Sequence, residues 1–191
     1  MNPASHFLIS WLTANTVQLT RRERFLITCS GLAPDVDGLG VIGDVLTRNS
    51  DKPLQWWGDY HHLLGHNILF GGCLTAAVFL FAKKRKAAAL LALISFHLHL
   101  FCDLIGSRGP DGYQWPIPYF WPFSDAQQWT WQGQWALNAW PNLLITVTVL
   151  AATLHLAWQS GRSPLEFLAH KANAAFVAAL RSRFGEPNSL S

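Results

Sequence analysis

The pattern of apolar and polar positions divides the chain into apolar runs separated by charged segments. The clearest pair of runs covers residues 68–82 and 87–105, on either side of the basic segment 83–86. At a rise of about 1.5 Å per residue, His66 and Asp103 each lie roughly 26 Å from this basic segment. The pattern therefore predicts an antiparallel helical hairpin that brings histidines and an aspartate together at one end and cations at the other.

A second, shorter hairpin is predicted nearer the N-terminus. Residues 5–19 form one apolar run, residues 25–33 form another, and the basic segment 21–24 separates them. Each run is shorter than the roughly 20 residues that cross a bilayer, so we expect these helices to be partly inserted or packed against longer neighbours. The hairpin would place His6 and Asp35 at the histidine-rich end of the longer hairpin.

The remaining segments predict two loops and two helices. Residues 39–60 are rich in Gly, Asp and Trp, which indicates a loop with one short helix. Residues 106–141 contain four prolines in their first half, and these exclude a continuous helix. Residues 142–158 are apolar enough for a spanning helix, and residues 164–184 have the spacing of an amphipathic helix.

Composition places the chain among membrane proteins. Of its 191 residues, 50% are hydrophobic and 13% are charged, and ten are tryptophans, which favour the membrane interface. We therefore expect an all-α, multi-pass membrane helical bundle with short helical hairpins and a long Trp/Pro-rich interfacial loop. The membrane-embedded domain is expected over residues 1–160, followed by a C-terminal amphipathic helix and tail over 161–191.

The charges indicate the orientation and the partners. The net charge of +3 comes from small clusters, so membrane lipids are expected as partners and nucleic acid is not. If the chain crosses the membrane as predicted, the cations fall on one side, which the positive-inside rule places in the cytoplasm of a bacterial cell. The histidine-rich end of this inner-membrane protein would then face the non-cytoplasmic side. The oligomeric state has no signal in the sequence.

Ionisable groups near one end of the bundle are the candidate chemistry. They are His6, Asp35, Asp37, His61, His62, His66, His97, His99 and Asp103. The pairs His62/His66 and His99/Asp103 are spaced i, i+4, so each pair can hold a single ion from one helix face. Imidazole and carboxylate without thiolate suit zinc, manganese or iron, and more than four donors allow one or two ions bridged by an aspartate.

Simpler interpretations apply to several of these residues. Asp35 and Asp37 stand between a proline and a glycine, so both could be turn formers. His97 lies about 160° around the helix from Asp103, which makes it the weakest ligand candidate. One of His61 and His62 would be an interfacial side chain, and the spacing alone does not decide which.

The order of these motifs resembles that of a known family. The motifs are His6, Leu32-Ala33-Pro34-Asp35-Val36-Asp37, residues 61–66, His99-Leu-Phe-Cys-Asp103 and Trp121-Pro122-Phe123. Together they resemble the bacterial membrane-bound metal-dependent hydrolases, a group that includes an inner-membrane hydrolase controlled by the LexA repressor. The resemblance covers roughly residues 5–125. The chain also bears a weaker resemblance to the all-helical zinc-dependent phospholipase C enzymes, which share the order His, Asp, His, His-x-x-x-Asp.

The resemblance implies a set of metal ligands, and this chain departs from the family's usual sequence at two places. The implied metal ligands are His6, Asp35, His61, His66, His99 and Asp103. The family commonly has a histidine where this chain has Gly38, and Thr-His-Ser where it has Gly65-His66-Asn67. A proton-transfer role of the missing hydroxyl groups is therefore not expected here.

The sequence thus predicts a membrane-embedded, metal-dependent hydrolase of the phosphoesterase type that acts on a lipid-like substrate. Zinc is the expected metal, with manganese as the alternative. Asp35 and Asp37 are the expected catalytic residues, and Arg108, Asp111 and Trp115 are expected to bind substrate. Two other hypotheses are a non-catalytic membrane protein with a structural or transported metal, and a membrane anchor for a partner.

Overall fold

The computed structural model of the protein describes residues 1–109 and 112–187, and in these residues it has helices and no strand. In chain order the elements are α1 (Pro3–Ala14), α2 (Arg21–Leu32), the 3-10 helix η1 (Ala33–Leu39), α3 (Gly40–Thr47), α4 (Trp56–Tyr60), α5 (Ile68–Phe81), α6 (Arg85–Gly106), α7 (Trp140–Ser160), the 3-10 helix η2 (Pro164–Phe167) and α8 (His170–Phe184). The predicted all-α class is confirmed.

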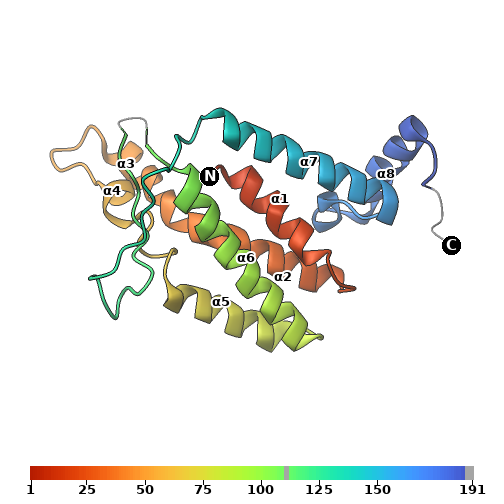
Figure 1. The fold of residues 1–191 in the computed structure, drawn as a ribbon, viewed down its shortest axis with the longest axis horizontal. Helices are drawn as coiled ribbons and strands as arrows, with labels where there is room; N and C mark the ends of the chain where they lie inside the picture. The colour runs from red at the N-terminus through yellow and green to blue at the C-terminus, as the bar shows by residue number, and fades with distance from the viewer. Residues whose placement is uncertain (110–111, 188–191) are drawn as a thin grey trace.

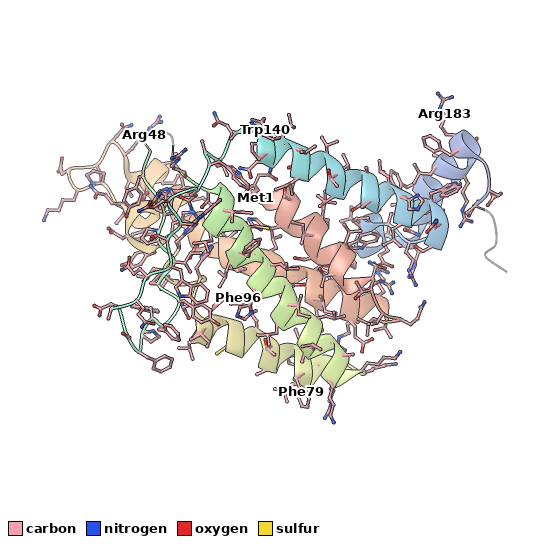
Figure 2. The ribbon with its side chains drawn as sticks, in the orientation of Figure 1. Met1, Arg48, Phe79, Phe96, Trp140 and Arg183 are labelled. Carbon is pink, nitrogen blue, oxygen red and sulfur yellow. The ribbon has the colours of Figure 1, made fainter. Side chains whose placement is uncertain are left out.

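The bundle is built around α2 and α6. Helix α1 packs against α2, α6 and α7, while α5 packs along α6 and also contacts α2 (Figure 1). Helices α3 and α4 gather at one end of the molecule with the segment that joins α6 to α7, and α8 lies at the other end. Arg48, next to α3, and Arg183, in α8, accordingly mark opposite ends in Figure 2.

The predicted hairpin of α5 and α6 is confirmed. Only residues 82–84 separate the two helices, and the basic segment 83–86 lies at this turn. Gly71 allows the close contact between them, because a Cβ there would lie 2.5 Å from the ring of Phe96. The helices therefore approach closely enough to bring their far ends level.

The start of α2 corrects the prediction for the first hairpin. The arginines of segment 21–24 do not precede the helix but form its first turn. Thr20 caps the helix by accepting from the Glu23 backbone N–H, and the Glu23 carboxylate accepts in return from the Thr20 backbone N–H at 2.8 Å. This reciprocal capping box stabilises the helix start one turn earlier than the apolar run begins.

The far end of α2 also differs from the prediction. Helical structure continues through η1 into α3, so Arg21–Thr47 is an apolar helical stretch of 27 residues that is long enough to cross a membrane. Segment 39–60 accordingly contains two short helices, α3 and α4, where one was predicted. Arg85–Gly106 and Trp140–Ser160 are the other stretches of the described chain with the length and composition of a span.

The C-terminal part has one long helix and one interrupted helix. Helix α7 ends where Gly161 adopts a left-handed conformation with φ 71°. The single helix predicted over residues 164–184 is instead divided into η2 and α8. Asn173 of α8 accepts from the Ser163 backbone N–H at 2.7 Å, which fixes the turn that precedes η2. The boundary between the domains 1–160 and 161–191 remains a prediction.

Candidate metal centre

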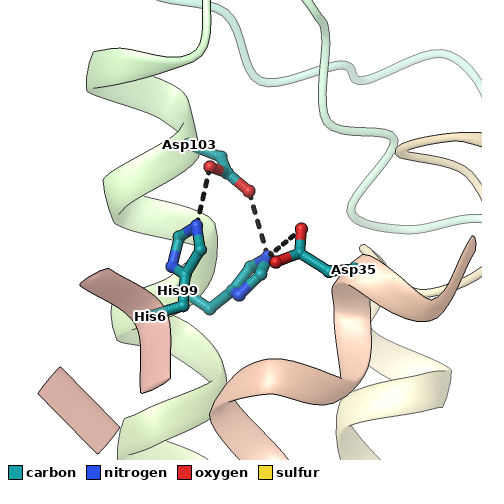
Figure 3. A group of neighbouring side chains, drawn as sticks. All are labelled: His6, Asp35, His99 and Asp103. Carbon is teal, nitrogen blue, oxygen red and sulfur yellow. Dashed lines mark hydrogen bonds and ion pairs between the residues drawn. The ribbon is translucent and has the colours of Figure 1, made fainter. Parts of the chain in front are cut away.

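The predicted ionisable residues meet where α1, η1 and α6 come together at the loop-covered end of the bundle. His6 comes from the second turn of α1, Asp35 from η1, and His99 and Asp103 from one face of α6 (Figure 3). Each offers one donor atom, and these atoms all lie within 4.8 Å of one another. We call these residues the first donor group.

Distances within the first donor group are close to those of a metal site. The His6 Nε2 to Asp103 Oδ1 distance is 3.1 Å, and the His99 Nε2 to Asp103 Oδ2 distance is 3.0 Å. His99 Nε2 also lies 3.7 Å from Asp35 Oδ1. Ligands of tetrahedral zinc at about 2.0–2.2 Å stand roughly 3.3–3.6 Å from one another. Small side-chain shifts would therefore suffice to hold an ion.

A second donor group shares Asp103. It consists of His62, His66 and Asp103, with donor atoms again within 4.8 Å of one another. His66 Nε2 lies 3.4 Å from Asp103 Oδ2, and the rings of His62 and His66 are stacked with centroids 4.3 Å apart. His62 reaches this position with a left-handed φ of 67°, which non-glycine residues seldom adopt. Asp103 is the member common to both groups.

Asp37 orients two histidines from outside the donor groups. Its carboxylate accepts from His61 Nδ1 at 2.9 Å, from His66 Nδ1 at 3.1 Å and from the Gly65 backbone N–H at 3.0 Å. In the neutral form of His66, a proton held on Nδ1 leaves the Nε2 lone pair available to bind a metal. His99 is prepared in the same way, because its Nδ1 donates to the Gly31 carbonyl at 2.8 Å.

The buried polar atoms of the donor groups fit a cation. The side chains of His6, His66, His99 and Asp103 are at most 2% exposed. Within the described residues, four buried atoms of the two groups make no hydrogen bond, although His99 Nε2 lies 3.0 Å from the last of them: His6 Nδ1, Asp35 Oδ2, His62 Nδ1 and Asp103 Oδ2. The α-amino group of Met1 supplies one positive charge at Asp103. A metal ion would offset the remaining cost of burying these carboxylates.

The two histidines of the second group differ in protonation. Burial, together with the neighbouring His66, holds the pKa of His62 well below its usual range. Burial alone would also lower the pKa of His66, but contacts with Asp103 and Asp37 raise it to about 9. At neutral pH His62 is therefore ready to bind a metal, whereas binding at His66 requires release of a proton.

An aromatic hollow adjoins the second donor group on the outside. It has a volume of about 240 Å³, and its lining includes Trp115, Tyr113, Gln128, His61 and His62. The Trp115 ring lies 5.4 Å from the His61 ring and 5.5 Å from the His62 ring, measured between centroids. The loop between α6 and α7 thus supplies one wall beside the histidines.

The structure brings most of the predicted ligands together. His6, Asp35, His66, His99 and Asp103 belong to the donor groups, whereas His61 is held by Asp37 and His62 stands in the second group instead. The predicted i, i+4 pair His62/His66 does form, but residues 61–67 are turns rather than a helix, so the left-handed backbone at His62 and not a shared helix face brings the two rings together. His97 lies apart, since its ring hydrogen-bonds to Leu93 and Tyr119.

The structure places the predicted substrate-binding residues differently with respect to the donor groups. Trp115 lines the aromatic hollow beside the second group. Arg108 begins the loop after α6, where its backbone pairs with that of Trp135 and Leu137, and no side-chain contact with the donor groups is found in the described residues. Asp111 lies outside the described residues. The orienting role of the Gly31 carbonyl had no signal in the sequence.

Gly65 is expected to be essential for this arrangement. A Cβ at this position would lie 2.3 Å from the Pro34 carbonyl oxygen, and the Gly65 N–H donates to Asp37. The Gly65→Ala variant should therefore separate this loop from η1 and lower metal affinity about tenfold, through Asp37. Isothermal titration with zinc measures this loss. Gly58→Ala is the control, because a Cβ there meets nothing within 4 Å; equal affinity of both variants would contradict the expectation.

Comparison with known proteins identifies a family. The model of the YdjM inner membrane protein family matches residues 1–183. Neither the curated proteins nor the solved structures give a match.

Proposed function

Since the chain belongs to the YdjM inner membrane protein family, we propose that it is a membrane-embedded, metal-dependent hydrolase of lipid-like esters. The observation that carries the proposal is the pair of donor groups that share Asp103 at the loop-covered end of the bundle. Zinc is the expected metal, with manganese as the alternative, and one or two ions would be bound. The LexA-regulated inner-membrane hydrolases that the sequence resembles are consistent with this proposal.

The residues divide into holding and orienting roles. His6, His99 and Asp103 would hold one ion with Asp35, and His62 and His66 would hold a second ion together with Asp103. When bound, such an ion acts as a Lewis acid that lowers the pKa of water and polarises the oxygen of an ester or phosphoester. Asp37 has both oxygens engaged by histidines and the Gly65 N–H, so it is a positioning residue.

Asp35 is the carboxylate best placed to meet the substrate. Its side chain is 20% exposed, whereas that of Asp103 is 2% exposed. Its Oδ2 is buried and makes no hydrogen bond within the described chain, so this oxygen remains available to a metal. Asp35 would therefore accept a proton from the attacking water or hold a metal at the open side of the centre. The aromatic hollow at Trp115 would receive the part of the substrate beyond the ester.

The surroundings of the centre favour an amphiphilic substrate. Val36, Leu39, Ile42 and Leu46 follow Asp35 at helical spacing and are all more than half exposed. They form an apolar stripe along η1 and α3 that starts beside the open carboxylate, and it suits an acyl chain. The cations of the turns and of α8 lie toward the other end of the bundle, so the centre would face the non-cytoplasmic side.

A structural metal is the second candidate function. The first donor group offers four protein ligands, and a site closed by four protein ligands is typical of structural zinc. In that case the ion would join α1, η1 and α6 without reaching a substrate. The exposure of Asp35 favours the hydrolase over this alternative.

An activity assay with the metal-loaded protein separates the two functions. Protein in lipid nanodiscs is supplied with zinc or manganese and offered a phosphomonoester, a phosphodiester and a carboxylic ester of a lipid, and product is measured by mass spectrometry. We expect turnover of one class and a loss of about 100-fold in Asp35→Asn. Asp51→Asn, at an exposed loop residue, should retain the activity. Protein that binds metal but hydrolyses none of the three classes would support the structural role instead.

A further inference from the structure

We propose that a hollow at the start of α2 binds the phosphate of an anionic phospholipid. The hollow has a volume of about 300 Å³ and is lined by Arg21, Arg22, Phe25 and Phe167. No residue of either donor group lines it, since those residues lie toward the opposite end of the bundle. The inference is therefore independent of the proposed hydrolase.

A buried ion pair between Arg24 and Glu166 holds the wall of this hollow in place. Arg24 Nε donates to Glu166 Oε1 at 2.7 Å and its terminal nitrogen donates to Oε2 at 2.5 Å, so the pair is bidentate. It fixes η2 against α2 and places the Phe167 ring edge-on to Phe25, with centroids 5.3 Å apart. The two phenyl rings form an apolar surface next to the arginines.

The charge of the hollow is positive and uncompensated. Arg21 is held in place because its guanidinium donates to the Phe167 carbonyl at 3.2 Å and to His170 Nε2 at 3.0 Å. Arg22 is exposed and makes no hydrogen bond or ion pair with any described residue.

The acidic residues next to this hollow in sequence are already engaged. Glu23 accepts from Thr20 and from the Lys84 backbone N–H, and Glu166 accepts from Arg24. They therefore leave the charge of the two guanidinium groups available. Planar, weakly hydrated guanidinium groups match the oxygens of a phosphate.

The position of the hollow relative to the membrane favours a lipid over free phosphate as the ligand. Arg21 is the first residue of the apolar stretch Arg21–Thr47, so it lies where the bilayer core gives way to headgroups. Phe25 follows one helical turn deeper and is 47% exposed. A phospholipid would place its phosphate on the arginines and its first methylene groups on Phe25. A free phosphate ion would leave this apolar surface without a partner.

Native mass spectrometry of the full chain tests this assignment. Protein purified in detergent is titrated with dioleoylphosphatidylglycerol or with dioleoylphosphatidylcholine, and retained lipid is counted for each. We expect the wild type to retain the anionic lipid in preference. Arg21→Gln/Arg22→Gln should weaken this retention at least about tenfold, because a charge-assisted hydrogen bond from a guanidinium group to the phosphate contributes about tenfold.

A matched control separates the hollow from general charge attraction. Lys171→Gln/Arg183→Gln removes the same charge from exposed positions of α8 that do not line the hollow, so its lipid retention should stay within about twofold of wild type. Equal loss in the two double variants would overturn the proposal, and so would equal retention of the two lipids by the wild type. Retention of inorganic phosphate in place of lipid would also overturn it.

Two single variants distinguish a loss of lipid binding from a folding defect of the double variant. Arg22→Gln removes no hydrogen bond or ion pair of the described chain, so it should fold normally and still weaken retention of the anionic lipid about tenfold. Phe25→Ala should weaken lipid retention without adding any affinity for inorganic phosphate. Wild-type retention in both variants would contradict the proposed pose.

Discussion

Asp103→Asn should remove bound metal from the protein and reduce ester hydrolysis by about 1000-fold or more, because the Lewis acid contributes several kcal/mol to such reactions. Asp103 is the residue that the two donor groups share, so its replacement affects both. The amide has nearly the same shape as the carboxylate but lacks the charge that attracts the ion. Elemental analysis and the hydrolysis assay measure the two effects on the same preparation.

The control for this variant is an aspartate of the same loop-covered end. Asp125 is exposed in the loop between α6 and α7 and belongs to neither donor group, so Asp125→Asn should keep wild-type metal content. The circular dichroism spectrum shows whether Asp103→Asn retains its helices. A folded Asp103→Asn protein that binds as much metal as the wild type would contradict the assignment.

Glu166→Gln should destabilise the protein by about 3–5 kcal/mol, because it leaves the Arg24 guanidinium buried without its counter-charge. Both side chains are 7% exposed, and Arg24 also donates to the Leu19 carbonyl at 2.5 Å. The loss should appear as a lower midpoint of thermal unfolding in detergent. Replacing both residues, as Arg24→Met/Glu166→Met, should recover much of the stability, since no charge is then left unpaired.

A surface pair provides the comparison for this ion pair. Arg181 Nε lies 3.6 Å from Glu186 Oε2, and the Glu186 side chain is 77% exposed. Glu186→Gln should therefore change the stability by no more than about 1 kcal/mol. A loss in Glu166→Gln as small as that in Glu186→Gln would show that the buried pair does not hold η2 against α2.

The longer hairpin was predictable because two simple rules determine it. His66 and Asp103 lie equally far in sequence from the basic turn, so an antiparallel hairpin brings them level, and their side chains meet at 3.4 Å. The i, i+4 spacing of His99 and Asp103 likewise placed both on one face of α6. Helical periodicity thus predicted the two α6 members of the first donor group.

Helix ends were less predictable because polar contacts set them. The start of α2 depends on the capping box of Thr20 and Glu23, a Thr-x-x-Glu signal that the pattern of apolar runs does not include. The continuation into α3 was not predicted because Pro34 and Gly38 are typical of a turn, whereas the chain continues there as a 3-10 helix.

The choice between His61 and His62 depended on backbone geometry. Residues 61–67 form turns rather than a helix, and the left-handed conformation at His62 directs that ring toward His66. The contact of His99 with the Gly31 carbonyl joins residues far apart in the chain, so no local pattern indicates it. Such contacts arise only when α2 and α6 pack together.

Metal content is the most direct test of the central claim, which is that the shared donor groups hold a metal ion. Detergent-purified wild-type protein is supplied with zinc or manganese, freed of unbound metal and examined by elemental analysis. The arrangement of the donor groups predicts one or two equivalents per chain. No bound metal after this treatment would contradict the account and would leave these histidines and aspartates as a polar network between α1, η1 and α6.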